Sequence, residues 1–90
     1  MADKVFIAFQ NNSEAQPIIE AVLEDNPDAE LNETPGMVKI DCPRRLVVRR
    51  ESVEEKIGRD FDLQEIHINM ISIGGNLDET DDEFILEWNV

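Results

Sequence analysis

Apolar and polar positions alternate at the start of the chain and then change to a helical spacing. Residues 5–10, VFIAFQ, alternate in the way that predicts a largely buried strand. Apolar side chains within residues 15–23 recur three and four positions apart, which predicts a helix with one apolar face. Ser13 and Gln16 have the spacing of a capping box at its start, and Pro27 follows its end.

Two short strands follow, and with the first two elements they complete a β-α-β-β unit. We expect these strands over residues 29–34 and 37–41, joined as a hairpin. In the connecting sequence Thr34-Pro35-Gly36-Met37, proline and glycine occupy the central positions in which a type II turn favours them.

The same order of elements recurs in the second half of the chain. We expect a strand over residues 46–49 and a short helix over residues 52–58. Phe61-Asp62-Leu63 then leads into a strand that ends near Ile73, and a last strand covers residues 84–88. Ser52 has capping-box spacing with the glutamate three residues later, and the helix ends on a glycine that suits a C-cap.

This order of elements predicts an α+β fold. Two tandem β-α-β-β units, about residues 4–41 and 45–89, would form mainly antiparallel sheets with two helices packed on them. A chain of 90 residues fits one domain, which we expect to span residues 1–90.

The strand pattern breaks down within residues 69–77, NMISIGGNL. Apolar and polar positions alternate over residues 65–70, with Ile68 on the apolar side. Ile71 and Ile73 then fall on the polar side, where a soluble protein should meet water. Apolar side chains rimmed by polar ones are typical of protein contacts, so this segment is a candidate binding site.

The charge excludes some classes of partner. The formal net charge is -13, which argues against nucleic acid and against anionic membranes. Seven of the eight basic residues lie between Lys39 and Arg59, and none follows Asp60. This uneven distribution is either a solvated surface or a dipole that orients the protein on a partner.

Motifs for catalysis or for a cofactor do not occur. Cys42 is the single cysteine and His67 the single histidine, which makes a zinc or iron site improbable. The acidic run DETDDE lacks the glycine and glutamate that an EF-hand loop requires. Gly74-Gly75 belongs to no phosphate-binding motif, and marks either a turn or bulge or a close approach of another chain. No apolar run could span a membrane or serve as a signal peptide, so we expect a cytoplasmic protein.

As a whole, the sequence resembles the coupling, or regulatory, proteins of bacterial multicomponent monooxygenases, in particular those of the phenol hydroxylase branch. The resemblance spans nearly the whole chain and is carried by FIAFQNN, IIEAVLEDNP, PGMVKID, RLVVRRESVEEKIGRDFDLQEIHINMISIGGNLDE and FILEW. The segments GRDFDLQE and DETDDEF are its most specific parts. The two β-α-β-β units of that family agree with the pattern of elements predicted above.

This resemblance implies a non-catalytic subunit that carries no metal or organic cofactor. Its partner would be a hydroxylase with a carboxylate-bridged di-iron centre, while a separate reductase delivers electrons from NADH and would interact with it only indirectly. The subunit would dock over the active-site region and tune the access of substrate and dioxygen. Turnover of phenol or another aromatic would then waste less NADH.

The resemblance also implies a partner-binding segment. In the related methane monooxygenase regulators, the segment after the GR motif and its following strand presents small and polar side chains to the hydroxylase. Counted from Gly58-Arg59, the matching residues here run from 69 to 76, where Ile71 and Ile73 are larger than their counterparts. The expected partner-binding residues are His67, Asn69, Ile71, Ser72, Ile73, Gly74, Gly75 and Asn76.

Two other classes of function stay open at this point. The chain could be an acidic binding module that blocks or mimics a charged surface in an unrelated system, since acidity alone would favour such a role. It could also be a small metal-dependent enzyme, which elemental analysis would reveal as a stoichiometric metal.

Overall fold

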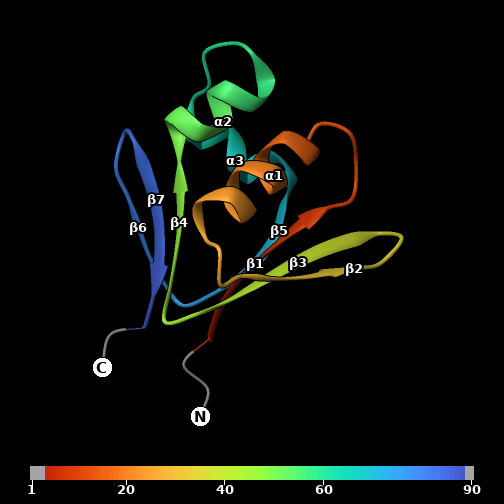
Figure 1. Cartoon of the computed structure of the whole chain (residues 1–90), viewed down its shortest axis with the longest axis vertical. Helices are drawn as coiled ribbons and strands as arrows, with labels where there is room; N and C mark the ends of the chain where they lie inside the picture. The colour runs from red at the N-terminus through yellow and green to blue at the C-terminus, as the bar shows by residue number, and fades with distance from the viewer. Residues whose placement is uncertain (1–3, 89–90) are drawn as a thin grey trace.

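The computed structural model describes residues 4–88, which form two antiparallel sheets with the helices in the angle between them (Figure 1). The larger sheet has the strand order β2-β3-β1-β5 and the smaller one the order β4-β7-β6. The strands are β1 (Lys4–Gln10), β2 (Glu30–Glu33), β3 (Met37–Pro43), β4 (Arg45–Arg49), β5 (Met70–Gly74), β6 (Asn76–Glu79) and β7 (Glu83–Glu87). The helices are α1 (Gln16–Asp25), α2 (Arg50–Ile57), the 3-10 turn η1 (Leu63–Glu65) and α3 (Ile66–Asn69). The predicted α+β fold with antiparallel sheets is confirmed.

The two sheets do not follow the two predicted halves of the chain. Strand β5 comes from the second half but pairs with β1 of the first, so it belongs to the larger sheet. The smaller sheet therefore contains β4, β6 and β7 alone. The division into halves at about residues 4–41 and 45–89 stays a prediction.

One hydrophobic core joins both sheets and the helices. Phe9 and Ile40 of the larger sheet, and Leu46 and Phe84 of the smaller one, are fully buried in the same cluster. The apolar face of α1 fills the space between them, since its residues Ile18, Ile19, Ala21 and Val22 are all buried. A chain of this length can bury only one thin core, and a shared one explains why the sheets meet at an angle.

The helix starts differ from the sequence prediction. Helix α1 begins at Gln16 with no side-chain cap from Ser13; instead the Asn12 Oδ1 accepts the Ala15 N–H at 2.9 Å. Helix α2 begins at Arg50, before Ser52, so the second predicted capping box is also wrong. The predicted glycine cap at the end of α2 is confirmed, because Gly58 has a φ of 75°.

The strand predicted to follow Phe61-Asp62-Leu63 and to end near Ile73 is wrong for its first part, because the residues from Leu63 to Asn69 are helical. Leu63 and Ile66 are buried at helical spacing, and Asp62 with Glu65 forms a capping box that starts η1. The alternation that favoured a strand came from Ile68, which lies in α3 and faces solvent. A four-residue helix gives too few repeats for periodicity to distinguish it from a strand.

The predicted turn type also needs correction. Gly36 is absent from the residues with positive φ, so the turn between β2 and β3 is not type II. Within the acidic run DETDDE, Asp78 and Glu79 belong to strand β6 and Glu83 to β7, so the stretch from Thr80 to Asp82 forms the turn. Trp88 is half exposed and donates its Nε1–H to the Lys4 carbonyl at 2.9 Å.

Asn26 attaches the end of α1 to the smaller sheet. Its Nδ2 donates to the carbonyls of Val22 and Val47, both at 2.7 Å, and its Oδ1 accepts the Val47 N–H at 3.0 Å. Val47 lies on the edge strand β4, so this buried side chain pairs with the strand as a neighbouring strand would.

We therefore expect Asn26→Ala to lower the free energy of unfolding by about 2–3 kcal/mol, because it leaves part-buried backbone groups of Val47 unpaired. Urea unfolding measures the change. Asn32→Ala is the matched control, since Asn32 is exposed and makes one side-chain hydrogen bond, to Asp41. An equal effect of the two substitutions would contradict the role assigned to Asn26.

Gly75 provides a second stability test. It has a φ of +130°, and a Cβ there would lie 2.9 Å from Cγ1 of the fully buried Val5. We expect Gly75→Ala to destabilise the fold by about 1–3 kcal/mol through backbone strain and overpacking. Gly36→Ala is the control, because no atom lies within 4 Å of its added Cβ. Equal shifts of the urea midpoint in Gly75→Ala and Gly36→Ala would rule out strain and overpacking at Gly75 as the cause.

Candidate partner-binding surface

The described residues offer little for catalysis. Within residues 4–88, no group of three or more His, Cys, Asp and Glu side chains could hold a metal ion. Cys42 is buried, and burial together with the charge of Asp28 raises the pKa of its thiol, so the thiol stays protonated at neutral pH. None of the helices in this part of the chain is both long and apolar enough to cross a membrane.

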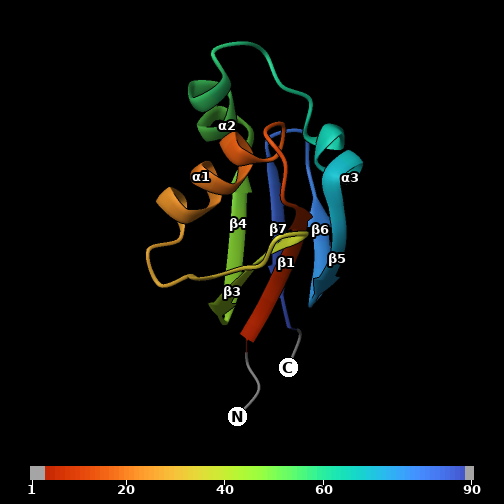
Figure 2. The ribbon, with the colours of Figure 1, turned by 90° about the vertical axis from the view of Figure 1, so that its right-hand side faces the viewer.

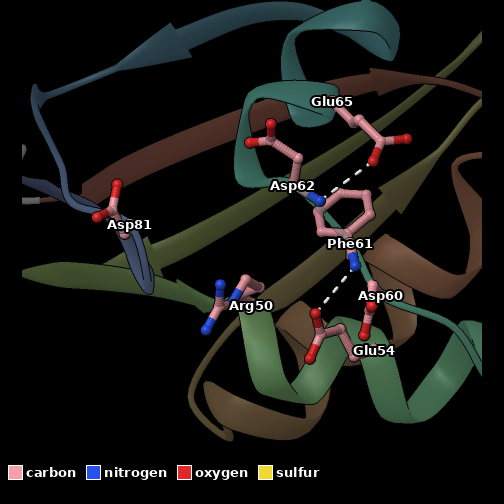
Figure 3. A pocket seen from close by; sticks show the side chains of 7 residues that line it. All are labelled: Arg50, Glu54, Asp60, Phe61, Asp62, Glu65 and Asp81. Carbon is pink, nitrogen blue, oxygen red and sulfur yellow. Dashed lines mark hydrogen bonds between the residues drawn. The ribbon is translucent and has the colours of Figure 1, made fainter.

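One hollow on the surface is acidic, and hydrogen bonds inside the chain occupy several of its carboxylates. Arg50, Glu54, Asp60, Phe61, Asp62, Glu65 and Asp81 line it (Figure 3). Glu54 accepts the Phe61 N–H at 2.9 Å, and Glu65 accepts the Asp62 N–H at 3.1 Å. Arg50, its one cation, pairs with Asp82 at 2.7 Å. The first two contacts shape the connection between α2 and η1, and the ion pair joins the start of α2 to the turn before β7.

Strand β5 presents a different kind of surface. It forms the edge of the larger sheet and pairs only with β1. Ile73 lies opposite Ile7 and Met70 lies opposite Phe9, but the register shifts between Ala8 and Phe9. The shift makes Ile71 an extra residue without a partner on β1, which is a β-bulge.

This bulge explains the break in the hydrophobic pattern. Ile73 and Met70 are three residues apart, yet both pack against the core, because the extra residue restores the register between them. The expectation that Ile73 faces solvent is therefore wrong in the isolated chain, where its side chain is half-buried. Ile71 is 49% exposed and Ser72 is exposed beside it. The bulge thus turns one isoleucine outward on an edge strand.

Helix α3 lies immediately before β5 (Figure 2). It carries a second exposed isoleucine. Ile68 is 68% exposed, which makes it the most exposed large apolar side chain within residues 4–88. The sequence pattern placed it on the buried side, and the structure overturns that placement. Ile68, Ile71 and Ser72 together are called the α3–β5 surface below. Leu77, on β6, is also exposed.

Two of the expected partner-binding residues make contacts inside the chain. His67 Nε2 lies 2.9 Å from Glu79 Oε1, and its ring centre is 5.9 Å from that of Phe84. Asn69 is buried and accepts a hydrogen bond from Asn12 Nδ2 at 3.0 Å. Both side chains hold α3 in place, and their expected role in partner contact stays a prediction.

Contacts inside the chain also account for the two expected glycines, Gly74 and Gly75. A Cβ at Gly74 would lie 2.3 Å from Cε1 of Phe6, its cross-strand partner on β1. Gly75 combines a positive φ with close contact to Val5. A side chain at position 74 would displace the Phe6 ring, and the positive φ at position 75 favours glycine where β5 turns into β6. Approach of another chain to Gly74, Gly75 and the exposed Asn76 stays a prediction.

Sequence reasoning missed Ile68 and Glu79. The capping box of Asp62 and Glu65, followed by buried residues at helical spacing, was the signal that could have placed Ile68 on a helix. Nothing in the sequence indicated that Glu79 lies on a strand beside that helix, since the contact joins residues 12 positions apart through the fold.

Comparison with known proteins gives consistent matches over the whole domain. The sequence profile of the MmoB/DmpM family matches residues 3–87. The chain is 49% identical over 88 residues to the phenol 2-monooxygenase stimulatory component DmpM of Pseudomonas sp. (strain CF600), covering 98% of both chains. It is 35% identical over 76 residues to the effector subunit of the alkene monooxygenase system of Xanthobacter autotrophicus (strain ATCC BAA-1158 / Py2), covering 82% of this chain and 73% of that one.

Comparison with solved structures agrees with these sequence matches. A chain in a structure of the phenol hydroxylase–regulatory protein complex superimposes with a TM-score of 0.92 and 58% identity, covering 96% of this chain and 99% of that one. The relatives are named as stimulatory, regulatory or effector components of monooxygenases. Sequence profile, curated relatives and fold agree, and the chain belongs to the MmoB/DmpM family.

Proposed function

We propose that this chain is the cofactor-free regulatory subunit of a multicomponent phenol or aromatic monooxygenase of the cytoplasm. It binds the di-iron hydroxylase component and tunes the conformation of its active site. Access of substrate and dioxygen changes as a result, and NADH use becomes better coupled to hydroxylation. The NADH reductase is affected only indirectly, through the hydroxylase that both proteins contact.

The observation that carries this proposal is the α3–β5 surface. It holds two exposed isoleucines, 68% and 49% exposed, on backbone that is fixed by the core and by β1. Exposed apolar side chains on a rigid support are typical of protein contact sites. The relatives support the identity of the partner, since the similar chain of the complex structure is the regulatory protein of a phenol hydroxylase.

Binding changes the hydroxylase only through a difference in affinity. If the hydroxylase has two conformations, this subunit shifts them by as much as it prefers one over the other. A coupling of about 1–3 kcal/mol alters a linked binding affinity roughly 5- to 150-fold. Ile71 and Ser72 would contact the hydroxylase directly, whereas Met70 and Ile73 anchor the strand from behind.

The negative surface charge of the chain would steer it toward a basic surface of the hydroxylase. Seven basic side chains, among them Arg49 and Arg59, already lie within ion-pair distance of a carboxylate in the described residues. The excess of acids that gives the net charge of -13 is therefore free to interact with a basic surface. Such steering speeds association and weakens with salt, but it does not select a partner. Acidity alone would equally suit a binding module from an unrelated system. The choice between these two functions therefore rests on the apolar contacts.

Reconstitution tests the proposal. The hydroxylase and reductase of the same source are mixed with phenol and NADH, with and without this chain, and catechol formed is compared with NADH consumed. We expect the chain to raise the rate of catechol formation, to saturate near stoichiometric ratios and to raise the catechol formed per NADH. An active hydroxylase that ignores the chain at every ratio would refute a regulatory role.

Charge placed on the bulge tests the surface. We expect the double variant Ile71→Asp, Ser72→Asp to abolish stimulation, because it puts two carboxylates where a dry contact should form. Both side chains are exposed, so circular dichroism and the urea midpoint should stay close to wild type. Leu31→Asp is the control, since Leu31 is similarly exposed on β2 at the opposite edge of the sheet. Full stimulation by the double variant would show that β5 does not contact the hydroxylase.

A further inference from the structure

Helix α3 is too short to hold its own shape. It has four residues, and its N-cap residue makes no side-chain cap hydrogen bond. Isolated helices several times longer are only marginally stable in water, so α3 depends on contacts to the rest of the fold. Those contacts determine where Ile68 points.

Glu79 on β6 supplies the first set of contacts. One carboxylate oxygen lies 2.9 Å from His67 Nε2, and the other accepts a hydrogen bond from Gln64 Nε2 at 2.8 Å. Gln64 belongs to η1 and His67 to α3, so a single side chain holds both short helical elements against the smaller sheet. Phe84 of β7 adds a tilted ring contact to His67.

The other side of α3 is fixed as well. Ile66 is fully buried, and Asn69 accepts the hydrogen bond from Asn12 just before α1. Three of the four side chains of α3 are therefore occupied within the chain, and Ile68 is the fourth. Because the other three side chains hold the backbone of α3, that backbone loses little conformational freedom when Ile68 binds, which is a source of affinity.

The surroundings of Ile68 indicate an apolar contact with a charged rim. A small hollow beside it is lined by the apolar side chains of Ile18, Ile57 and Phe61. Glu14, Glu65 and Arg59 stand around this hollow, and the last two form an ion pair at 3.4 Å. The chain then continues directly into β5, which carries the second exposed isoleucine, Ile71.

We infer that Glu79 is a positioning residue that clips α3 to the sheets, so that Ile68 inserts as an anchor into an apolar recess of the hydroxylase. The inference rests on the proposed function, because it names a second contact of the same surface. Glu79 acts through His67 and Gln64, whereas Ile68 touches the partner.

The test compares dissociation constants for the hydroxylase with folded-state measurements. Isothermal titration gives Kd, urea unfolding gives stability, and hydrogen exchange of the free protein reports the order of residues 64–69. The variants are Ile68→Ala, Glu79→Ala and Glu79→Gln, and the control is Leu31→Ala on β2. Glu79→Gln is the conservative variant, because the amide oxygen that it introduces can still accept a hydrogen bond from one of the two donors.

We expect Ile68→Ala to raise Kd about tenfold or more with an unchanged urea midpoint, as truncation of an exposed anchor does. Glu79→Ala should speed exchange over residues 64–69 and raise Kd although Ile68 is intact, and Glu79→Gln should lie between it and wild type. Leu31→Ala should leave Kd within a factor of about two, as residues outside an interface do.

Several outcomes would overturn the inference, and they are separate from failure of the proposed function. If Ile68→Ala bound the hydroxylase with the wild-type Kd, Ile68 would not be an anchor, and the proposed regulatory role would still stand. Faster exchange in Glu79→Ala with an unchanged Kd would reduce Glu79 to a purely structural residue. Absence of binding by the wild-type chain to an active hydroxylase would refute the proposed function itself.

Discussion

The pairing of β5 with β1 is the contact on which the rest of the arrangement depends. It brings a strand from the second half of the chain to the edge of the first sheet, and so joins two sheets around one core. It places the Phe6 ring over Gly74, and it favours glycine at position 75, where the chain turns toward β6 with a positive φ. The bulge within this pairing sends Met70 and Ile73 inward and leaves Ile71 outside. The same pairing thus builds the fold and exposes the surface.

The fold class could be read from the sequence because its main elements have strong periodicity. Residues 5–10 and the apolar face of α1 each repeat often enough to define a strand and a helix. Helix α3 and strand β6 have four residues each, too few for a pattern to appear. Their positions are determined by long-range contacts such as that of His67 with Glu79, which local periodicity does not encode.

The candidate surface was predicted in part for the same reason. The apolar residue Ile71 stood out because it broke an alternation, and it is exposed as expected. Ile73 broke the same alternation but is half-buried, because a bulge shifts the register in a way that sequence spacing does not reveal. Ile68 fitted the alternation and was assigned to the core, although it is the more exposed of the two α3–β5 isoleucines. Exceptions to a pattern indicated where to look, but contacts across the sheets decided which side chains face outward.

We propose a small binder whose contact surface is held by one hydrophobic core. In the proposed complex, acidic charge would bring the chain to the hydroxylase, and the exposed isoleucines on α3 and β5 would form the contact. A hydrogen-exchange footprint of its complex with the hydroxylase tests this claim most directly. The account predicts that exchange slows over residues 66–74 on binding and stays unchanged in β2, at the opposite edge of the sheet. Protection of β2 without protection of residues 66–74 would contradict it.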